Sequence, residues 1–297
     1  MAKKLLLIFN AYSGKGSIKT HLWEVIDILT KDGYEVHAYS TQQKGDATRI
    51  VERIGRRYHV ITACGGDGTL NEVVCGAMTL TKRPFIAYIP TGTTNDFATC
   101  IGLPKNIKKA AQSITRAVPL SCDIGSFNGN YYTYVSAFGA FTEVSYKTPR
   151  QSKNTIGHLA YVFEGMKSLS NIKPYDVTVE TESEKIEGKF ILGMITNSNY
   201  IGGYENVLLK DFSINDGLFE VILIRNPNNP LDLQMILNSI ISRKPDPRHV
   251  KIFKASKIKI SSEEEIPWTL DGEFGGSHKE ANIEIIPNAI TLLKSYE

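Results

Sequence analysis

The chain has 297 residues, of which 42% are hydrophobic and 22% are charged, and its formal net charge is +3. This composition is ordinary for a globular protein and excludes an intrinsically disordered chain, while the length suits two domains that each bury a core. No basic run is interleaved with aromatic residues, and no apolar stretch approaches the roughly 20 residues that span a bilayer, so neither nucleic-acid binding nor a transmembrane segment is indicated.

Charge distribution and cysteine usage add two further indications. Residues 1–118 contain 16 Lys and Arg and 9 Asp and Glu, which gives +7, and the remaining residues therefore carry −4. This excess favours an anionic ligand or surface, although a solvated surface is the simpler interpretation of charge alone. The four cysteines form no Cys-x-x-Cys pair and have no histidine partner at metal spacing, which indicates a reduced, cytoplasmic chain.

The first 118 residues alternate strand-like and helix-like segments. The pattern predicts strands at 4–9, 34–40, 58–63 and 84–89, and helices at 17–31, 46–57 and 105–116. Such alternation predicts an α/β domain with a mostly parallel sheet that is covered on both faces. In sheets of this kind ligands bind beyond the carboxyl ends of the strands.

After residue 119 short β-branched runs dominate. Asn128-Gly129 separates two such runs, 122–127 and 131–135, and is the strongest local hairpin signal in the chain. Further strands are expected at 177–182, 190–196, 218–224, 257–261 and 283–286, with helices at 156–169 and 231–241. We therefore expect a largely antiparallel, β-sandwich-like domain over 119–286, and a tail, 287–297, that returns toward the first domain.

A glycine-rich turn follows the third predicted strand, and a helical pattern follows the turn. Three glycines within residues 65–68 leave backbone N–H groups uncovered where a helix begins, which is typical of a phosphate-binding site. The turn is not a Walker motif, because Thr69 and Leu70 stand where that motif needs Lys and then Ser or Thr. It is not a dinucleotide fingerprint either, because Asn71 occupies the position of the third glycine.

Two other loops follow predicted strands. Residues 10–16 read Asn-Ala-Tyr-Ser-Gly-Lys-Gly, and residues 90–98 read Pro-Thr-Gly-Thr-Thr-Asn-Asp-Phe-Ala. Without context each is a turn, and Thr94 or Asn95 is then a helix cap. Because these two loops and the glycine turn fall at the same edge of the predicted sheet, a shared binding site is the better interpretation.

These loops carry a family resemblance. Gly-Gly-Asp-Gly-Thr-Leu-Asn-Glu, residues 65–72, resembles the nucleotide-binding signature of the diacylglycerol kinase catalytic superfamily, which includes lipid, sphingosine and ceramide kinases. The loop at 90–98 resembles a second motif of that superfamily, and the loop at 10–14 matches its Asn-Pro-x-Ser-Gly motif except for Ala11. Thr99 stands where many members have arginine. The chain thus resembles the bacterial soluble, YegS-like diacylglycerol and lipid kinases.

The resemblance implies a set of nucleotide and metal contacts. Asp67 and Asp96 are implied to hold catalytic Mg²⁺. Asp216 is implied to hold a structural Mg²⁺ together with the backbone carbonyls of Ser213 and Leu218. An Asn-Asp-Gly turn is also expected at residues 215–217. The implied contacts of ATP are Asn10, Ser13, Gly14, Thr41, Gly65, Gly66, Asp67, Gly68, Thr69, Asn71, Glu72, Gly92, Thr93, Asn95 and Asp96. Upstream of Asp216, residues 202–204 match the glycine cluster of the family only in part.

The last motif is Leu270-Asp271-Gly272-Glu273, between two predicted strands. In isolation it is an Asp-Gly turn. It also matches the superfamily's Asp-Gly-Glu, in which a carboxylate accepts the proton of the lipid hydroxyl. We expect Glu273 to be the proton acceptor, with Asp271 supporting it or contacting the magnesium network; the reverse assignment stays open.

The sequence therefore predicts an ATP- and Mg²⁺-dependent lipid kinase that phosphorylates a lipid hydroxyl, with diacylglycerol as the expected substrate. The enzyme is expected to associate peripherally with the membrane. A basic rim of Lys147, Arg150 and Lys153, beside the apolar face of the helix at 156–169, could contact anionic lipid. The alternative is that this apolar face packs in the core of the protein. A kinase of the NAD-kinase type and a non-catalytic nucleotide sensor remain alternatives, and a homodimer is left open.

Overall fold

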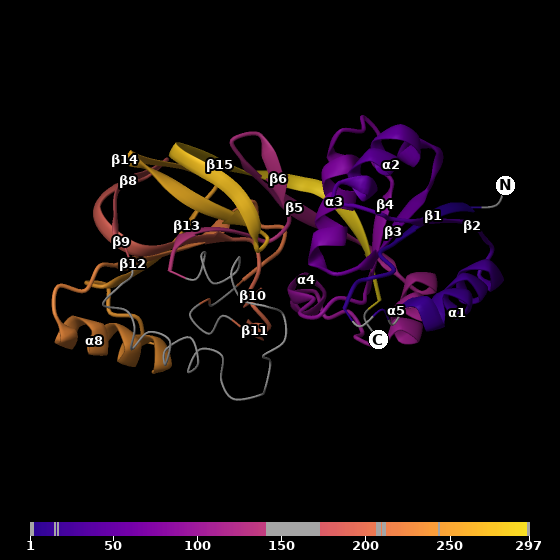
Figure 1. Ribbon diagram of the computed structural model, residues 1–297, viewed down its shortest axis with the longest axis horizontal. Coiled ribbons are helices and arrows are strands. Elements are labelled where there is room, and N and C mark those ends of the chain that lie inside the picture. Colours follow the sequence, from indigo (N-terminus) through magenta and orange to yellow (C-terminus); the bar gives the residue numbers. More distant parts are fainter. Residues whose placement is uncertain are drawn as a thin grey trace.

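The computed structural model describes residues 3–14, 16, 18–140, 173–205, 209, 212–242 and 244–295. An α/β part and a strand-rich part lie side by side along the long axis of the molecule (Figure 1). The predicted order of these two parts is confirmed. The predicted helix at 156–169 and the basic rim beside it lie outside the described residues.

The N-terminal part alternates strands and helices as expected. Its elements are β1 (Lys3–Phe9), α1 (Ile18–Lys31), β2 (Tyr34–Ser40), α2 (Asp46–Ile54), η1 (Gly55–Arg57), β3 (Val60–Gly65), α3 (Asp67–Met78), β4 (Phe85–Pro90), α4 (Asp96–Cys100) and α5 (Ile107–Thr115). The helix predicted over 46–57 is shorter than expected, because its last three residues form the 3₁₀ turn η1. The strands pair side by side in parallel, in the order β4, β3, β1, β2.

Helices cover both faces of these parallel strands. Successive strand residues point to opposite faces, so Leu6 and Ile8 of β1 pack with α2 and α3, while Leu5 and Leu7 pack with α1 and α5. All six residues of β3 are buried, as expected for a strand covered on both faces. The edge of the sheet, where the strands end, is therefore the place left for a ligand.

The packing of α2 on α3 depends on Gly76. A Cβ atom at this position would lie 2.7 Å from Cβ of Val51 and 2.8 Å from the carbonyl oxygen of Thr48. We expect Gly76→Ala to lower the free energy of unfolding by about 1–3 kcal/mol, because overpacking forces the helices apart. Urea unfolding measures this; Gly68→Ala is the control, since its Cβ would meet no atom within 4 Å. Equal stability of the two variants would contradict the prediction.

The second part consists mainly of strands. Its elements are β5 (Val118–Phe127), β6 (Asn130–Tyr132), β7 (Val135–Gly139), β8 (Tyr175–Thr181), β9 (Lys185–Thr196), β10 (Tyr200–Ile201), β11 (Tyr204–Glu205), β12 (Phe219–Arg225), α8 (Pro230–Ile241), β13 (Val250–Ala255), β14 (Lys257–Leu270) and β15 (Glu273–Lys294). The predicted hairpin is confirmed, since Asn128 and Gly129 both have positive φ, 47° and 85°, between β5 and β6. The strands β7, β10, β11 and β13 were not predicted.

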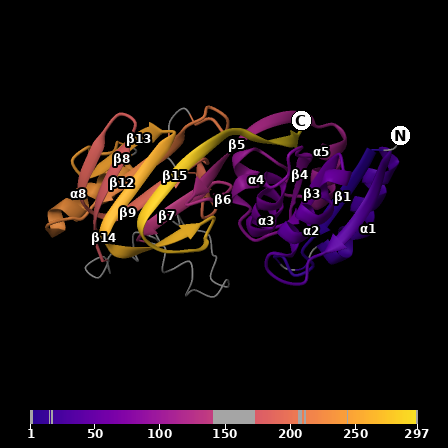
Figure 2. The same cartoon turned by 90° about the horizontal axis from the view of Figure 1, so that it is seen from above.

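The two parts share one continuous sheet. The long strand β15 pairs antiparallel with β14 and β5, and Leu292 near its end pairs in parallel with Ile86 of β4. Figure 2 shows β15 crossing from the strand-rich part to the α/β part. The tail after residue 287 thus lies against β4, while the division after residue 118 stays a prediction. None of the described helices is long and apolar enough to cross a membrane.

Candidate active site

Three of the predicted loops meet beyond the ends of β1, β3 and β4. The N–H groups of Thr91 and Gly92 donate to the carbonyl oxygen of Gly65, at 2.7 and 3.1 Å, and the N–H of Asn10 donates to that of Cys64 at 3.0 Å. Adjacent parallel strands end at the same edge of a sheet, which brings these loops together. Thr41 continues the edge beside β1, with its N–H 3.0 Å from the carbonyl oxygen of Phe9.

Glycine is required where the loops touch. Gly14 has φ of 58°, and a Cβ atom on it would lie 2.4 Å from the carbonyl oxygen of Thr91. A Cβ atom on Gly92 would lie 2.5 Å from Cα of Gly66. Only glycine permits this approach of backbone to backbone. Beside these contacts Ser13 and Thr69 are mostly buried, whereas Thr93 is exposed.

Asp67 joins the glycine turn to α4. Its Oδ2 accepts the N–H of Asp96 at 3.0 Å, and its Oδ1 accepts the N–H of Phe97 at 3.3 Å. The side chain of Asn95 makes no cap hydrogen bond to this helix, and its Nδ2 instead donates to the carbonyl oxygen of Gly92 at 3.0 Å. The cap that the sequence allowed at Asn95 is therefore provided by Asp67.

Asp96 connects the α/β part to the strand-rich part. Its two carboxylate oxygens accept the N–H groups of Gly202 and Gly203, both at 2.6 Å, in the turn between β10 and β11. Asp96 is only 3% exposed. Burial, and secondly the charge of Asp96, raise the pKa of Asp67 to about 7. Both side chains offer carboxylate oxygens, which are the ligands that suit Mg²⁺.

The next turn of α3 carries Asn71 and Glu72, which point to different partners. Nδ2 of Asn71 donates to Oδ2 of Asp271 at 2.7 Å. The carboxylate of Glu72 accepts the N–H groups of Gly45 and Ala47, at 2.8 and 3.1 Å, and so caps the start of α2. Of the residues predicted to contact a nucleotide, Glu72 is thus directed to α2 and Asn71 to the strand-rich part.

Asp271 is fully engaged by hydrogen bonds. Oδ1 accepts the N–H groups of Tyr134 and Val135 at 2.9 and 3.0 Å. Oδ2 accepts the N–H and the hydroxyl of Thr133, at 2.7 and 2.6 Å, in addition to Asn71. The residue is 6% exposed, and burial raises the pKa of Asp271. With five donors around it, this carboxylate holds the turn between β14 and β15 in place and has no free oxygen edge for a substrate.

Glu273 lies two residues further along and has an open environment. Its side chain is 56% exposed, and Oε2 lies 3.1 Å from Nζ of Lys44, whose side chain is 78% exposed. Lys44 belongs to the loop before α2, which Glu72 holds through Gly45. The sequence contained no local signal for Lys44, since the contact joins residues that are 229 positions apart.

The predicted structural metal site lies before β12 in the strand-rich part. Oδ2 of Asp216 pairs with Nζ of Lys254 at 2.8 Å, and Oδ1 accepts the N–H of Leu218 at 3.1 Å. Lys254 also pairs with the buried Glu220 at 3.1 Å. The hydroxyl of Ser213 donates to Oδ1 of Asn215 at 3.0 Å. The Asp216 carboxylate therefore already has a cationic partner.

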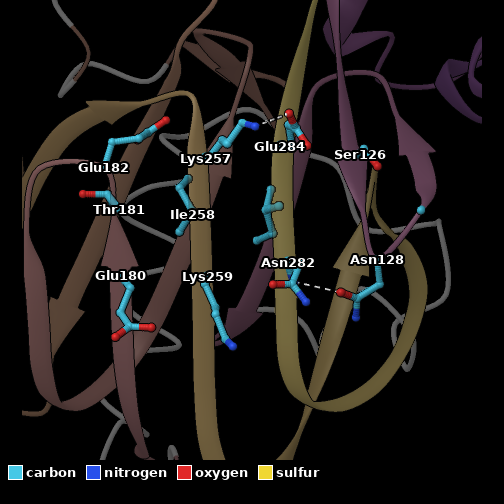
Figure 3. Close-up of a pocket in the computed structure, with 12 residues that line it drawn as sticks. Ser126, Asn128, Glu180, Thr181, Glu182, Lys257, Ile258, Lys259, Asn282 and Glu284 are labelled. Carbon is cyan, nitrogen blue, oxygen red and sulfur yellow. Dashed lines mark hydrogen bonds and ion pairs between the residues drawn. The ribbon is translucent and has the colours of Figure 1, made fainter.

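A hollow of about 640 Å³ lies away from these residues. It is formed by side chains of β5, β8, β14 and β15, among them the ion pair Lys257–Glu284 at 2.9 Å (Figure 3). Asn128 accepts the N–H of Asn282 on the same surface at 2.8 Å. The hollow is lined by none of the residues that the sequence predicted for catalysis, nucleotide binding or metal binding, so its size alone does not make it a candidate for the chemistry.

The chain is similar to known proteins along both parts. Two family models match it, the diacylglycerol kinase catalytic domain over residues 4–127 and the YegS C-terminal NAD kinase beta sandwich-like domain over residues 136–294. A diacylglycerol kinase of Bacillus subtilis (strain 168) is 35% identical over 92% of this chain and 91% of that protein, and one of Staphylococcus carnosus (strain TM300) is 38% identical over 93% and 90%. A crystal structure of a diacylglycerol kinase from Bacillus anthracis str. Sterne has a TM-score of 0.78 and 25% identity, covering 99% of this chain and 98% of that one.

Proposed function

The chain belongs to the diacylglycerol kinase family and is a lipid kinase, and from this premise we propose that it transfers the γ-phosphoryl group of ATP to the hydroxyl of diacylglycerol. The product is phosphatidic acid. The observation that carries the proposal is the hydrogen bond of 2.7 Å between Asn71 and Asp271. It ties the hairpin that bears Glu273 to the helix that begins at the glycine turn, and so brings a base and a phosphate site into one unit.

The nucleotide binds along the edge formed by the loops at 10–14, 65–69 and 91–96. The uncovered N–H groups at the start of α3 favour the negative charge of a phosphate. Ser13, Thr69 and Thr93 add hydroxyl donors at the same edge. Glu72 acts indirectly, because its hydrogen bonds to the N–H groups at the start of α2 fix the loop that contains Lys44.

Mg²⁺ is the cofactor that best fits Asp67 and Asp96. When bound, the ion neutralises the charge of the phosphates and of the two carboxylates. Asp67 is the more open ligand, since it is partly exposed whereas Asp96 is only 3% exposed. A second ion at Ser213, Asp216 and Leu218 fits less well, because Lys254 already provides a positive charge there, and no step is derived from it.

Glu273 accepts the proton of the lipid hydroxyl as the oxygen attacks the γ-phosphorus. Phosphoryl transfer needs little covalent chemistry from the protein, so orienting the hydroxyl and removing its proton are its main tasks. Asp271 positions Glu273 and takes no part in proton transfer. Phe274, which is 58% exposed beside Glu273, provides an apolar surface that suits an acyl chain better than a soluble substrate.

A substrate panel tests the proposal. Purified protein is incubated with radiolabelled ATP, with and without Mg²⁺, and with mixed micelles of diacylglycerol, ceramide or sphingosine, or with NAD in solution. We expect label to enter the lipid fraction with diacylglycerol and to depend on Mg²⁺. Phosphorylation of NAD alone, or nucleotide binding without transfer to any lipid, would contradict the proposed substrate. In the cell the enzyme is proposed to act on the surface of a membrane without spanning it.

A further inference from the structure

The side chain of Glu273, the proposed proton acceptor, is held by a single contact. Its backbone is fixed by the turn between β14 and β15, in which Asp271 and Gly272 have φ of 49° and 81°. Among the described residues, Nζ of Lys44 alone pairs with the carboxylate, at 3.1 Å from Oε2. A glutamate side chain without this partner would be free to sample several rotamers. The direction of the carboxylate therefore depends on Lys44.

The loop that carries Lys44 is held on both sides of this residue. Before it, the N–H groups of residues 42–43 donate to Oδ2 of Asp46 at 2.7 and 2.9 Å. After it, the N–H of Gly45 donates to Oε1 of Glu72 at 2.8 Å. Asp46 is 8% exposed. Connecting loops are usually more mobile than the elements that they join, so a loop with these contacts presents the ammonium of Lys44 from an unusually fixed backbone.

The ion pair contributes little to folding but can contribute to the reaction. Both side chains are mainly exposed, 78% for Lys44 and 56% for Glu273, and ion pairs of this kind are weak in water. During phosphoryl transfer, however, the carboxylate and the γ-phosphoryl group both lie near the attacking hydroxyl, and two negative groups repel each other. An ammonium beside the carboxylate offsets this repulsion. Its effect increases when a lipid substrate excludes water from the pair.

We propose that Lys44 is a positioning residue for the proton acceptor. Its ammonium donates to Oε2 of Glu273 and leaves Oε1 as the oxygen that accepts the proton of the lipid hydroxyl. That proton moves to Oε1 as the hydroxyl oxygen bonds to the γ-phosphorus and the bond to the leaving ADP breaks, while Lys44 keeps its three protons. The inference rests on the proposed function, and it gives Lys44 a role through Glu273 rather than through a contact with either substrate.

The variant Lys44→Met tests the proposal, because methionine is of similar length and carries no charge. We expect kcat for diacylglycerol phosphorylation to fall about five- to tenfold, as an ion pair that water no longer screens is lost. KM for ATP and the melting temperature should be unchanged. Lys44→Arg should restore most of kcat, since a guanidinium also donates to a carboxylate. Steady-state kinetics in mixed micelles and thermal unfolding measure these quantities.

A matched control lies on α1. Lys31 is 76% exposed and pairs with Oδ2 of Asp27 at 2.8 Å, so it resembles Lys44 in exposure and in having one carboxylate partner. Lys31→Met should have the kcat of the original enzyme. An equal fall in kcat in Lys31→Met and Lys44→Met would indicate a general effect of surface charge and would overturn the proposal.

A double variant shows whether Lys44 acts through Glu273. In the Glu273→Gln background, adding Lys44→Met should change the residual rate by less than about twofold, because effects of residues in contact are not additive. The same fall in both backgrounds would overturn the proposal, as would full kcat in Lys44→Met. A raised KM for ATP with kcat kept would assign Lys44 to the nucleotide instead. Absence of diacylglycerol phosphorylation by the original enzyme would contradict the proposed function, not the role of Lys44 alone.

Discussion

Replacing Glu273 with glutamine is expected to lower kcat for diacylglycerol phosphorylation by about 10²- to 10⁴-fold, the range for removing a general base. The amide keeps the size of the side chain but cannot accept the proton of the lipid hydroxyl. Because Glu273 is half exposed and makes one ion pair with Lys44, its loss should leave the melting temperature within about 2 °C of the original. Nucleotide affinity should also be kept, since the loops that we propose to bind ATP do not contain Glu273. Steady-state kinetics in mixed micelles, thermal unfolding and nucleotide titration measure the three quantities.

A matched control lies on the same strand. Glu284 of β15 is 55% exposed and pairs with Lys257 at 2.9 Å, so it resembles Glu273 in exposure and in having one lysine partner. Glu284→Gln should have the activity of the original enzyme. If Glu273→Gln were also active, the proton acceptor would have to be sought elsewhere. A comparable loss in both variants would indicate a general effect of charge on β15 rather than proton transfer.

The sequence was most informative where chemistry is local. A strand, three glycines and a helix start correctly predicted the turn from β3 into α3, and the Asn128-Gly129 turn was recognisable because both residues must adopt positive φ. Local patterns failed for β7, whose sequence Val-Ser-Ala-Phe-Gly has little β-branched character. They also failed for the length of β15, which follows from its pairing with β14, β5 and β4 rather than from its own residues.

The candidate site shows the same division between local and distant contacts. The residues of one motif could be assigned to the same site from the sequence, but the hydrogen-bond partner of each side chain could not be predicted from the motif. Asn71 contacts Asp271 across 200 positions, and Asp96 contacts Gly202 across 106. Glu72 looked like part of a nucleotide signature and proved to cap α2, because only the fold brings Gly45 next to it. The roles of the three carboxylates therefore depend on tertiary contacts.

Replacing Asp271 with alanine is expected to have the largest effect on stability. The change leaves the N–H groups of Thr133, Tyr134 and Val135 without their acceptor in a buried place, and each such group costs about 1–3 kcal/mol. We expect the free energy of unfolding to fall by at least about 3 kcal/mol, measured by urea unfolding followed by circular dichroism. Asp176→Ala, at an exposed position of β8, should change it by less than about 0.5 kcal/mol. Equal stability of the two variants would mean that Asp271 is not the anchor of the hairpin.

The variant Asn71→Ala distinguishes two effects: the stabilisation of the β14–β15 hairpin, and the connection of this hairpin to α3 in the α/β part. Asn71→Ala removes one of the five donors to Asp271 and leaves the backbone donors of Thr133 to Val135 in place, so the loss of stability should be only about 1 kcal/mol. The hairpin that carries Glu273 then loses its direct hydrogen bond to α3. We therefore expect Asn71→Ala to lower kcat much more than it lowers stability, with KM for ATP nearly unchanged. Asp271→Ala should lower both kcat and the free energy of unfolding. The reason is that the hydrogen bonds by which Asp271 positions Glu273 are the same ones that stabilise the hairpin.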